Sequence, residues 1–165
     1  MTLSKIDSRF CSLHLIYLVR HGDALSATAH PDRPLSRAGR DAVEKIARSA
    51  KSNDVEIAAI YHSGIVRARE TAEILGKYLV PLRGVEAHSG LLPEDDPAIL
   101  KAELDSDESS VMLVGHLPYM NRLAGLLLTA DPNRLVVAFS PATMVCFSGA
   151  RGRWEIAWKL TSTQG

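Results

Sequence analysis

Side chains able to handle a phosphoryl group stand directly after three apolar runs of the sequence. Arg20 and His21 follow the run at 13–19, and His116 follows the run at 111–114. The run at 56–61 is followed by His62-Ser63-Gly64 and then by Arg67. A neutral imidazole nitrogen is a competent nucleophile near neutral pH, and guanidinium groups bind phosphate oxygens as a fixed fork. These residue types therefore predict phosphoryl transfer through a covalent histidine.

The elements that must position these residues alternate between strands and helices. Short apolar runs predict strands, and apolar residues that recur at helical spacing predict helices. The predicted strands cover residues 13–19, 56–61, 85–88, 111–114, 144–148 and 154–159. The predicted helices cover residues 37–50, 65–79, 97–104 and a segment that begins at Pro118 and reaches 128. This alternation predicts an α/β fold, a three-layer sandwich with a mostly parallel central sheet and helices on both faces.

Such a sheet makes a geometric prediction for the polar residues. Ligands of open α/β sheets bind beyond the carboxyl ends of the strands. If the three strands are parallel neighbours, the two histidines and two arginines converge at one end of the sheet. Glycine at position 22 would let the backbone approach a ligand closely, and a helix N-terminus near residues 63–67 would add amide donors for an anion.

Composition restricts the class of protein. The chain has 165 residues and 46% hydrophobic residues, which predicts one domain over 1–165 with residues 1–12 as a loosely ordered extension. Nineteen basic residues balance nineteen acidic ones, so no broad basic field for nucleic acid or anionic lipid is expected. We find no signal peptide and no apolar stretch of membrane-spanning length, which predicts a cytoplasmic protein. The two cysteines and six histidines lack metal-ligand spacing, so neither a metal nor another cofactor is expected.

The motifs resemble those of the histidine phosphatase superfamily. Residues 18–22 read Leu-Val-Arg-His-Gly, residues 63–68 read Ser-Gly-Ile-Val-Arg-Ala before Thr71-Ala72, and residues 114–116 read Val-Gly-His. More narrowly, Arg-His-Gly-Asp-Ala at 20–24, Arg-Pro-Leu-Ser at 33–36 and Gly-His-Leu-Pro at 115–118 resemble the SixA-type phosphohistidine phosphatases. The similarity runs from about residue 15 to 128 in the family's order, and the chain lacks the helical insertions of the phosphoglycerate mutases.

This resemblance implies roles for individual residues. His21 would be the nucleophile that becomes phosphorylated. Arg20, Arg67 and His116 would bind the phosphoryl group, with His116 charged while it does so. Gly22 and Asp23 would lie at the substrate, and Asp23 would orient Arg20 or the nucleophile. No metal is implied.

The proton donor for the leaving group is where the sequence departs from the family's pattern. Many members carry a glutamate after the central strand, but residues 89–96 here read Ser-Gly-Leu-Leu-Pro-Glu-Asp-Asp, and Gly90 stands near the expected place. Three interpretations follow. Glu94, Asp95 or Asp96 supplies the proton, Asp23 supplies it, or none is needed because the imidazole of phosphohistidine departs readily.

The substrate defines the remaining alternatives. The leading hypothesis is removal of phosphate from phosphohistidine on a partner protein. The first alternative is a phosphomonoesterase for a small phosphate ester. The second is a non-catalytic phospho-binding module, although such a module would not need an intact nucleophile.

Overall fold

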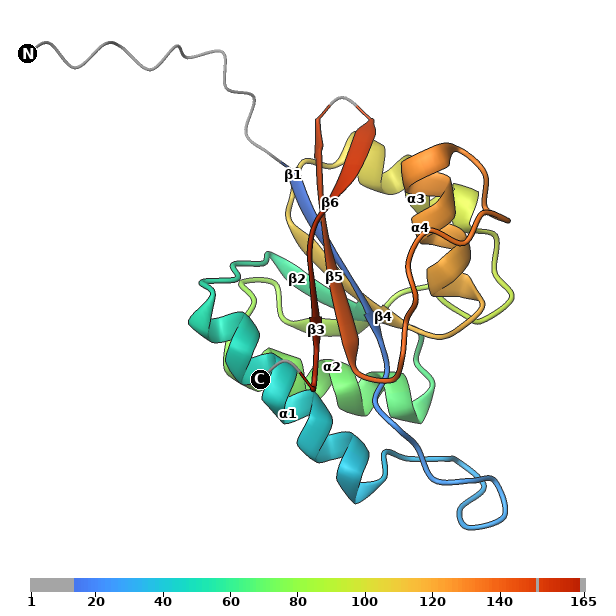
Figure 1. Ribbon diagram of the computed structural model, residues 1–165. Helices are drawn as coiled ribbons and strands as arrows, with labels where there is room; N and C mark the ends of the chain where they lie inside the picture. Colours follow the sequence, from blue (N-terminus) through green and yellow to red (C-terminus); the bar gives the residue numbers. More distant parts are fainter. Residues whose placement is uncertain (1–13, 151, 164–165) are drawn as a thin grey trace, which may run out of the picture.

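The computed structural model describes residues 14–150 and 152–163, which form a six-stranded sheet between two pairs of helices (Figure 1). The strand order is β3-β2-β4-β1-β5-β6. The strands are β1 (His14–Arg20), β2 (Ala59–His62), β3 (Val85–Ala87), β4 (Val111–Gly115), β5 (Thr143–Ala150) and β6 (Arg153–Thr161). The first four are parallel, and β5 and β6 join the edge beside β1 as an antiparallel pair. The predicted three-layer α/β sandwich is confirmed.

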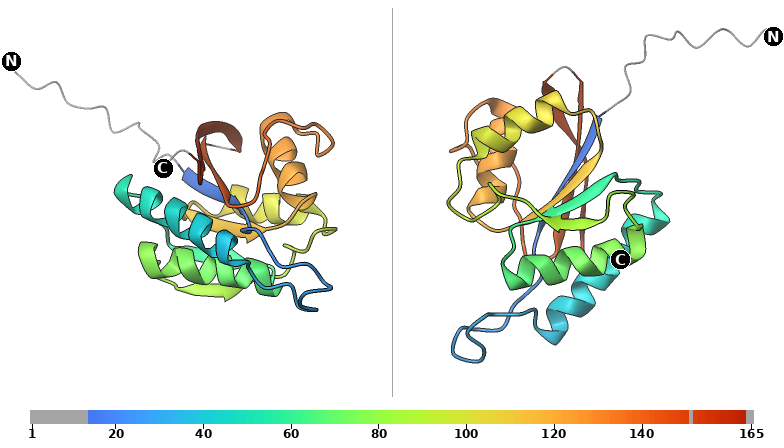
Figure 2. Two further views of the ribbon diagram at one scale, coloured as in Figure 1. Left: turned by 60° about the horizontal axis from the view of Figure 1, so that its bottom comes forward. Right: turned by 180° about the vertical axis from the view of Figure 1, so that it is seen from behind.

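Each helix pair covers one face of the sheet (Figure 2). The first pair is α1 (Arg37–Ser52) and α2 (Val66–Leu79), and the second is α3 (Pro97–Ser106) and α4 (Tyr119–Thr129). Two hydrophobic cores result, because strands buried on both faces contribute alternate side chains to each. Tyr17 and Val19 of β1 enter the core under α1 and α2, whereas Ile16 and Leu18 enter the core under α3 and α4.

Local signals in the sequence explain where the helices begin and how closely they pack. The Ser36 side chain caps α1 by accepting the Gly39 N–H at 2.9 Å, as its position before the helix predicts. Gly76, which lowers the helix propensity of α2, lies against β3, where a Cβ would collide with the Val85 side chain. Glycine lowers the helix propensity of α2 at this position, but its missing side chain allows α2 to pack closely against the sheet.

Two boundaries differ from the sequence prediction. The strand predicted at 56–61 begins only at Ala59, because Val55 and Ile57 are buried in the core as the chain leaves α1 and do not join a strand ladder. Pro118 is the N-cap of α4 and not a residue of its first turn. The N-terminal extension predicted at 1–12 lies outside the described residues.

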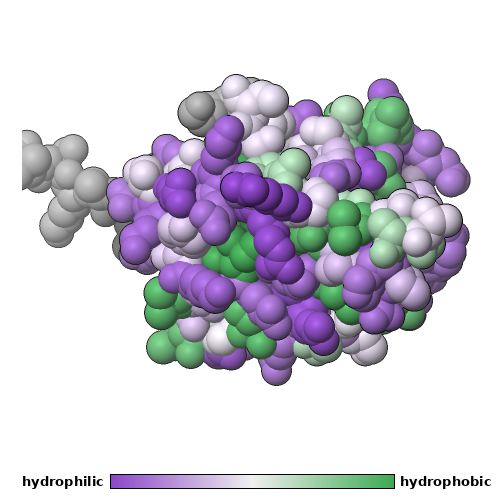
Figure 3. All heavy atoms as spheres, turned by 90° about the horizontal axis from the view of Figure 1, so that it is seen from below, coloured by the Kyte–Doolittle hydropathy of each residue, from purple (hydrophilic) through white to green (hydrophobic). Residues whose placement is uncertain are grey.

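The molecular surface mixes polar and apolar side chains. Seen from below, hydrophilic and hydrophobic residues are interspersed over the face that Figure 3 shows. Within the described ranges, no helix is long and apolar enough to cross a membrane.

Candidate active site

The three polar motifs meet at the carboxyl ends of β1, β2 and β4. β4 lies between β1 and β2 in the parallel part of the sheet, so the residues that follow these strands share one edge. The backbone fixes His21 there, because its N–H donates to the Gly115 carbonyl at 3.1 Å and its carbonyl accepts the Ala142 N–H at 3.1 Å. The predicted convergence is confirmed for His21, Arg67 and His116 by the contacts described next.

His21 is held in one neutral tautomer. Its Nδ1 lies 2.6 Å from the Gly22 carbonyl, which can only accept, so Nδ1 carries the proton. Its Nε2 accepts the Arg67 Nε–H at 3.3 Å, although 46 positions separate the two residues in sequence. The lone pair of Nε2 therefore points to a guanidinium group, which is the arrangement a nucleophile needs to attack a phosphoryl group bound by that arginine.

His116 lies beside His21, with 5.1 Å between the two ring centroids. Its Nε2 lies 2.6 Å from the Ser63 hydroxyl, and that hydroxyl oxygen also accepts the Ile65 N–H at 3.3 Å. The hydroxyl can donate to Nε2 or accept from it, because an oxygen that accepts one N–H keeps a second lone pair, so this contact fits either neutral tautomer of His116. The Nδ1 of His116 is buried and has no hydrogen-bond partner within the described residues.

Arg20 presents a second buried nitrogen without a partner among the residues that the structure describes. Its Nη1 donates to the Phe139 carbonyl at 2.8 Å, while its Nε is buried without a hydrogen-bond partner in the described part of the chain. A buried donor without a partner costs roughly 1–3 kcal/mol. Over the described ranges the site therefore retains an unsatisfied donor on Arg20 and an unpaired ring nitrogen on His116, and a tetrahedral oxyanion supplies an acceptor for the Arg20 donor and for His116 whenever its Nδ1 is protonated.

The electrostatics of the free site favour neutral histidines. Burial, with the charges of Arg67, Arg20 and Arg33, lowers the pKa of His21 to about 4, although its hydrogen bond to Gly22 acts in the opposite direction. Burial and the same neighbours Arg67 and Arg20, together with His21, lower the pKa of His116 to about 3. Burial also lowers the pKa of the Arg20 and Arg67 guanidinium groups. In the free protein His116 is thus neutral near pH 7, whereas the resemblance implies a charged His116 with phosphate bound.

Comparison with known proteins agrees with this geometry. A sequence model of the histidine phosphatase superfamily (branch 1) matches residues 16–91, which include Arg20, His21 and Arg67. Phosphohistidine phosphatase SixA of Escherichia coli (strain K12) is 26% identical over 151 residues, covering 88% of this chain and 92% of that protein. The chain is therefore similar in sequence to members of the histidine phosphatase superfamily.

Similarity to solved structures extends over most of the fold. The structure of the protein histidine phosphatase SixA complexed with tungstate superposes with a TM-score of 0.80 at 27% identity, covering 91% of this chain and 98% of that one. A phosphoglycerate mutase from Bacillus anthracis str. Sterne superposes with a TM-score of 0.67 at 16% identity, covering 87% of this chain and 91% of that one. The second comparison shows the shared fold.

Three of the four carboxylates considered as proton donors form hydrogen bonds outside the histidine and arginine cluster. The Asp23 carboxylate is exposed and accepts the Ser36 hydroxyl at 2.7 Å, so its described partner lies at the start of α1 and is neither Arg20 nor His21. Asp95 accepts the Leu92 N–H at 2.8 Å, and Asp96 caps α3 by accepting the Ala98 N–H at 3.0 Å. Glu94 is exposed in the same loop.

Sequence reasoning missed the roles of several polar residues that the structure places around these groups. Ser63 and Thr71 belong to the quoted motif, but only the fold shows that Ser63 contacts His116 and that Thr71 contacts Gly22. Arg33 stands in the Arg-Pro-Leu-Ser segment, and its charge acts on both His21 and Arg67. Within the described residues no group of three or more His, Cys, Asp or Glu side chains is arranged to hold a metal ion.

Proposed function

We propose that this protein is a phosphatase that removes the phosphoryl group from phosphohistidine on a partner protein by way of phosphorylated His21. Its similarity to the phosphohistidine phosphatase of Escherichia coli and to the protein histidine phosphatase bound to tungstate supports this substrate class. The observation that carries the proposal is the His21 ring itself. Its Nδ1–H is fixed by the Gly22 carbonyl and its Nε2 lone pair faces Arg67.

The reaction proceeds by two in-line displacements. In the first, Nε2 of His21 attacks phosphorus, the P–N bond of the substrate breaks, and its electron pair returns to the substrate imidazole, which takes up a proton. In the second, water attacks phosphorus, the bond to His21 breaks and inorganic phosphate leaves. Arg20, Arg67 and the N–H of His116 bind the phosphoryl oxygens, whose charge grows in the transition state.

The engagement of three candidate proton donors in other hydrogen bonds favours phosphohistidine over an ester as the substrate. Departure of an alkoxide requires a proton from a positioned acid, which contributes roughly 10²–10⁴-fold to the rate. Asp95 and Asp96 accept backbone N–H groups, and Asp23 accepts a hydroxyl proton of Ser36. An imidazole leaving group needs less assistance from the protein, because water can protonate the other ring nitrogen of the substrate before the P–N bond breaks, so that a neutral imidazole departs.

The decisive experiment combines turnover with trapping of the intermediate. A peptide carrying radiolabelled phosphohistidine is mixed with the wild-type protein, and the reaction is quenched in alkali. We expect release of phosphate and label on the protein that is stable in alkali and lost in acid. The H21A variant, shown to be folded by circular dichroism, should give neither.

Two results would contradict the proposal. Normal turnover by H21A would exclude His21 as the nucleophile. A kcat/KM for an aryl phosphate monoester well above that for the phosphohistidine peptide would indicate a phosphomonoesterase instead, and binding of both without turnover would indicate a phospho-binding module.

A further inference from the structure

Two adjacent residues of α2 hold both ends of the segment that follows the nucleophile. Thr71 is completely buried, and its hydroxyl accepts the Gly22 N–H at 3.1 Å. The same hydroxyl donates to the Arg67 carbonyl at 2.7 Å. One oxygen atom thus connects the residue after His21 to the backbone of the arginine that faces His21.

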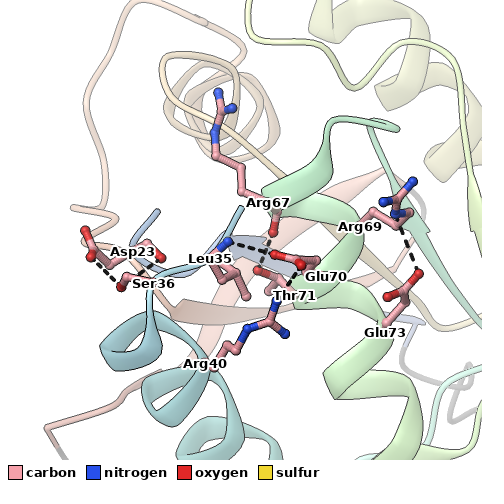
Figure 4. Close-up of polar contacts among 9 residues, drawn as sticks. All are labelled: Asp23, Leu35, Ser36, Arg40, Arg67, Arg69, Glu70, Thr71 and Glu73. Carbon is pink, nitrogen blue, oxygen red and sulfur yellow. Dashed lines mark hydrogen bonds and ion pairs between the residues drawn. The ribbon is translucent and has the colours of Figure 1, made fainter. Parts of the chain in front are cut away.

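Glu70 holds the other end of that segment. One carboxylate oxygen accepts the Leu35 N–H at 2.7 Å, and the other forms an ion pair with Arg40 of α1 (Figure 4). The Glu70 side chain is only 17% exposed, so its hydrogen bonds are partly shielded from water. In the same view the Arg67 side chain extends away from Glu70 and Arg40.

The segment between these two contacts, residues 22–35, closes on itself. The Leu25 N–H donates to the Pro34 carbonyl at 2.9 Å, and the Ser36 N–H donates to the Asp23 carbonyl at 2.9 Å. An isolated bridge between Ala24 and Leu35 joins the two sides of this loop. Hydrogen bonds therefore hold the two ends of the loop together, and the contacts of Glu70 and Thr71 attach these ends to α2.

We propose that Glu70 and Thr71 are positioning residues of the phosphoryl-transfer site, which set the separation and orientation of His21 relative to Arg67. The inference rests on the proposed function, since it concerns the same reaction. Arg67 lies three residues before Glu70 and four before Thr71. The helix turn that carries the Arg67 guanidinium therefore also forms hydrogen bonds with the backbone that follows His21. A misplacement of about 1 Å between reacting groups can cost about 10²-fold in rate.

The first test separates the effect of the Thr71 hydroxyl group from the effect of the side-chain shape. T71V keeps the branched side chain and removes the hydroxyl, whereas T71S keeps the hydroxyl and removes a methyl group. We expect T71V to lower kcat on the phosphohistidine peptide by roughly tenfold or more while KM changes little, because the chemical step depends on alignment. T71S should restore kcat to within about threefold of wild type, since it can make both hydrogen bonds.

The second test uses a matched pair of carboxylates on one helix. E70Q removes the charge that binds Arg40 and the Leu35 N–H, and E73Q makes the same chemical change on an exposed side chain, where Glu73 pairs with Arg69 at 3.7 Å. We expect E70Q to lower kcat roughly fivefold to tenfold, which is the net size of one ordinary hydrogen bond. E73Q should behave as wild type, because an exposed ion pair contributes little.

Hydrogen exchange provides a readout that does not depend on activity. In E70Q the Leu35 amide should exchange faster than in wild type, and in T71V the Gly22 amide should do so, while amides in the middle of β4 keep their protection. If wild type lacks phosphatase activity, the proposed function fails and these exchange rates still report whether the two contacts hold the loop.

Specific outcomes would overturn the positioning role. Folded T71V and E70Q with wild-type kcat would do so, as would T71S as impaired as T71V or E73Q as impaired as E70Q. If T71V does not fold, E70Q with its exposed control decides the matter, because the Glu70 carboxylate lies nearer the surface than the Thr71 hydroxyl.

Discussion

Acidification should destabilise the folded protein through its two active-site histidines. Their pKa values are about 4 for His21 and about 3 for His116 in the folded protein, whereas a histidine in an unfolded chain has a pKa of about 6.5. Between these values the unfolded chain binds more protons than the folded one, so the free energy of unfolding falls as the pH falls. This contribution is present above pH 6.5 and is lost as the pH drops toward the folded pKa.

The magnitude at pH 5 depends little on the folded pKa values. Because both lie below 5, the loss is determined almost entirely by protonation of the unfolded chain, and each histidine contributes about 2 kcal/mol between pH 7 and pH 5. The two together should therefore lower the free energy of unfolding by about 4 kcal/mol, a large share of the roughly 5–15 kcal/mol of a typical domain. Burial lowers the pKa of His62 as well, which acts in the same direction.

Urea unfolding at pH 7 and pH 5, followed by circular dichroism, measures this loss. The H116N variant removes one titrating group, so its loss between the two pH values should be smaller than that of wild type by about 2 kcal/mol. H30N makes the same change on an exposed loop residue and serves as the control for the substitution itself. An H116N variant with the full wild-type loss would refute a neutral, buried His116.

Three further predictions concern single residues of the site. R67A should lower kcat/KM on the phosphohistidine peptide about 10²-fold or more, because one preorganised donor to the phosphoryl group is lost, and a loss below tenfold would place Arg67 outside the site. S63A should lower kcat about fivefold and shift the ¹⁵N resonances of His116, since the partner of Nε2 is gone; unchanged resonances would contradict an influence of Ser63 on the His116 ring. G39A should destabilise the protein by about 1–3 kcal/mol in thermal unfolding, because a Cβ there would overlap the Asp23 carbonyl oxygen, and an unchanged Tm would show that the loop yields freely.

The sequence was sufficient to predict the sheet and the groups that meet at its edge. Apolar runs marked the buried strands β1 and β4, and polar residues directly after them marked the ligand end of a parallel sheet. His21, Arg67 and His116 meet because β4 lies between β1 and β2, which is a consequence of strand order. Local pattern thus located each side chain at the end of its strand, whereas the strand order that brings these ends together comes from the structure.

What the sequence could not predict depends on contacts between distant segments. The resemblance implies that Asp23 orients Arg20 or His21, but the backbone after His21 directs it to the Ser36 hydroxyl at the start of α1. The partners of Ser63 and Glu70 are 53 and 35 positions away in sequence. No periodicity or spacing rule predicts such pairs, because they arise only when helices and loops pack against the same strand ends.

Two descriptions of His116 are reconciled by the charge balance of the site. In the free protein, burial and the nearby guanidinium groups of Arg20 and Arg67 disfavour a further positive charge, and His116 is neutral. A phosphoryl dianion bound among these groups reverses the sign of the local field, so it favours the protonated imidazole. The charged His116 implied by the resemblance and the neutral His116 of the free protein therefore belong to two states of one site.

It follows that an oxyanion such as tungstate should bind with uptake of protons. Calorimetric binding enthalpies that vary with the ionisation enthalpy of the buffer would measure this uptake. Buffer-independent enthalpies would show that His116 keeps one charge throughout.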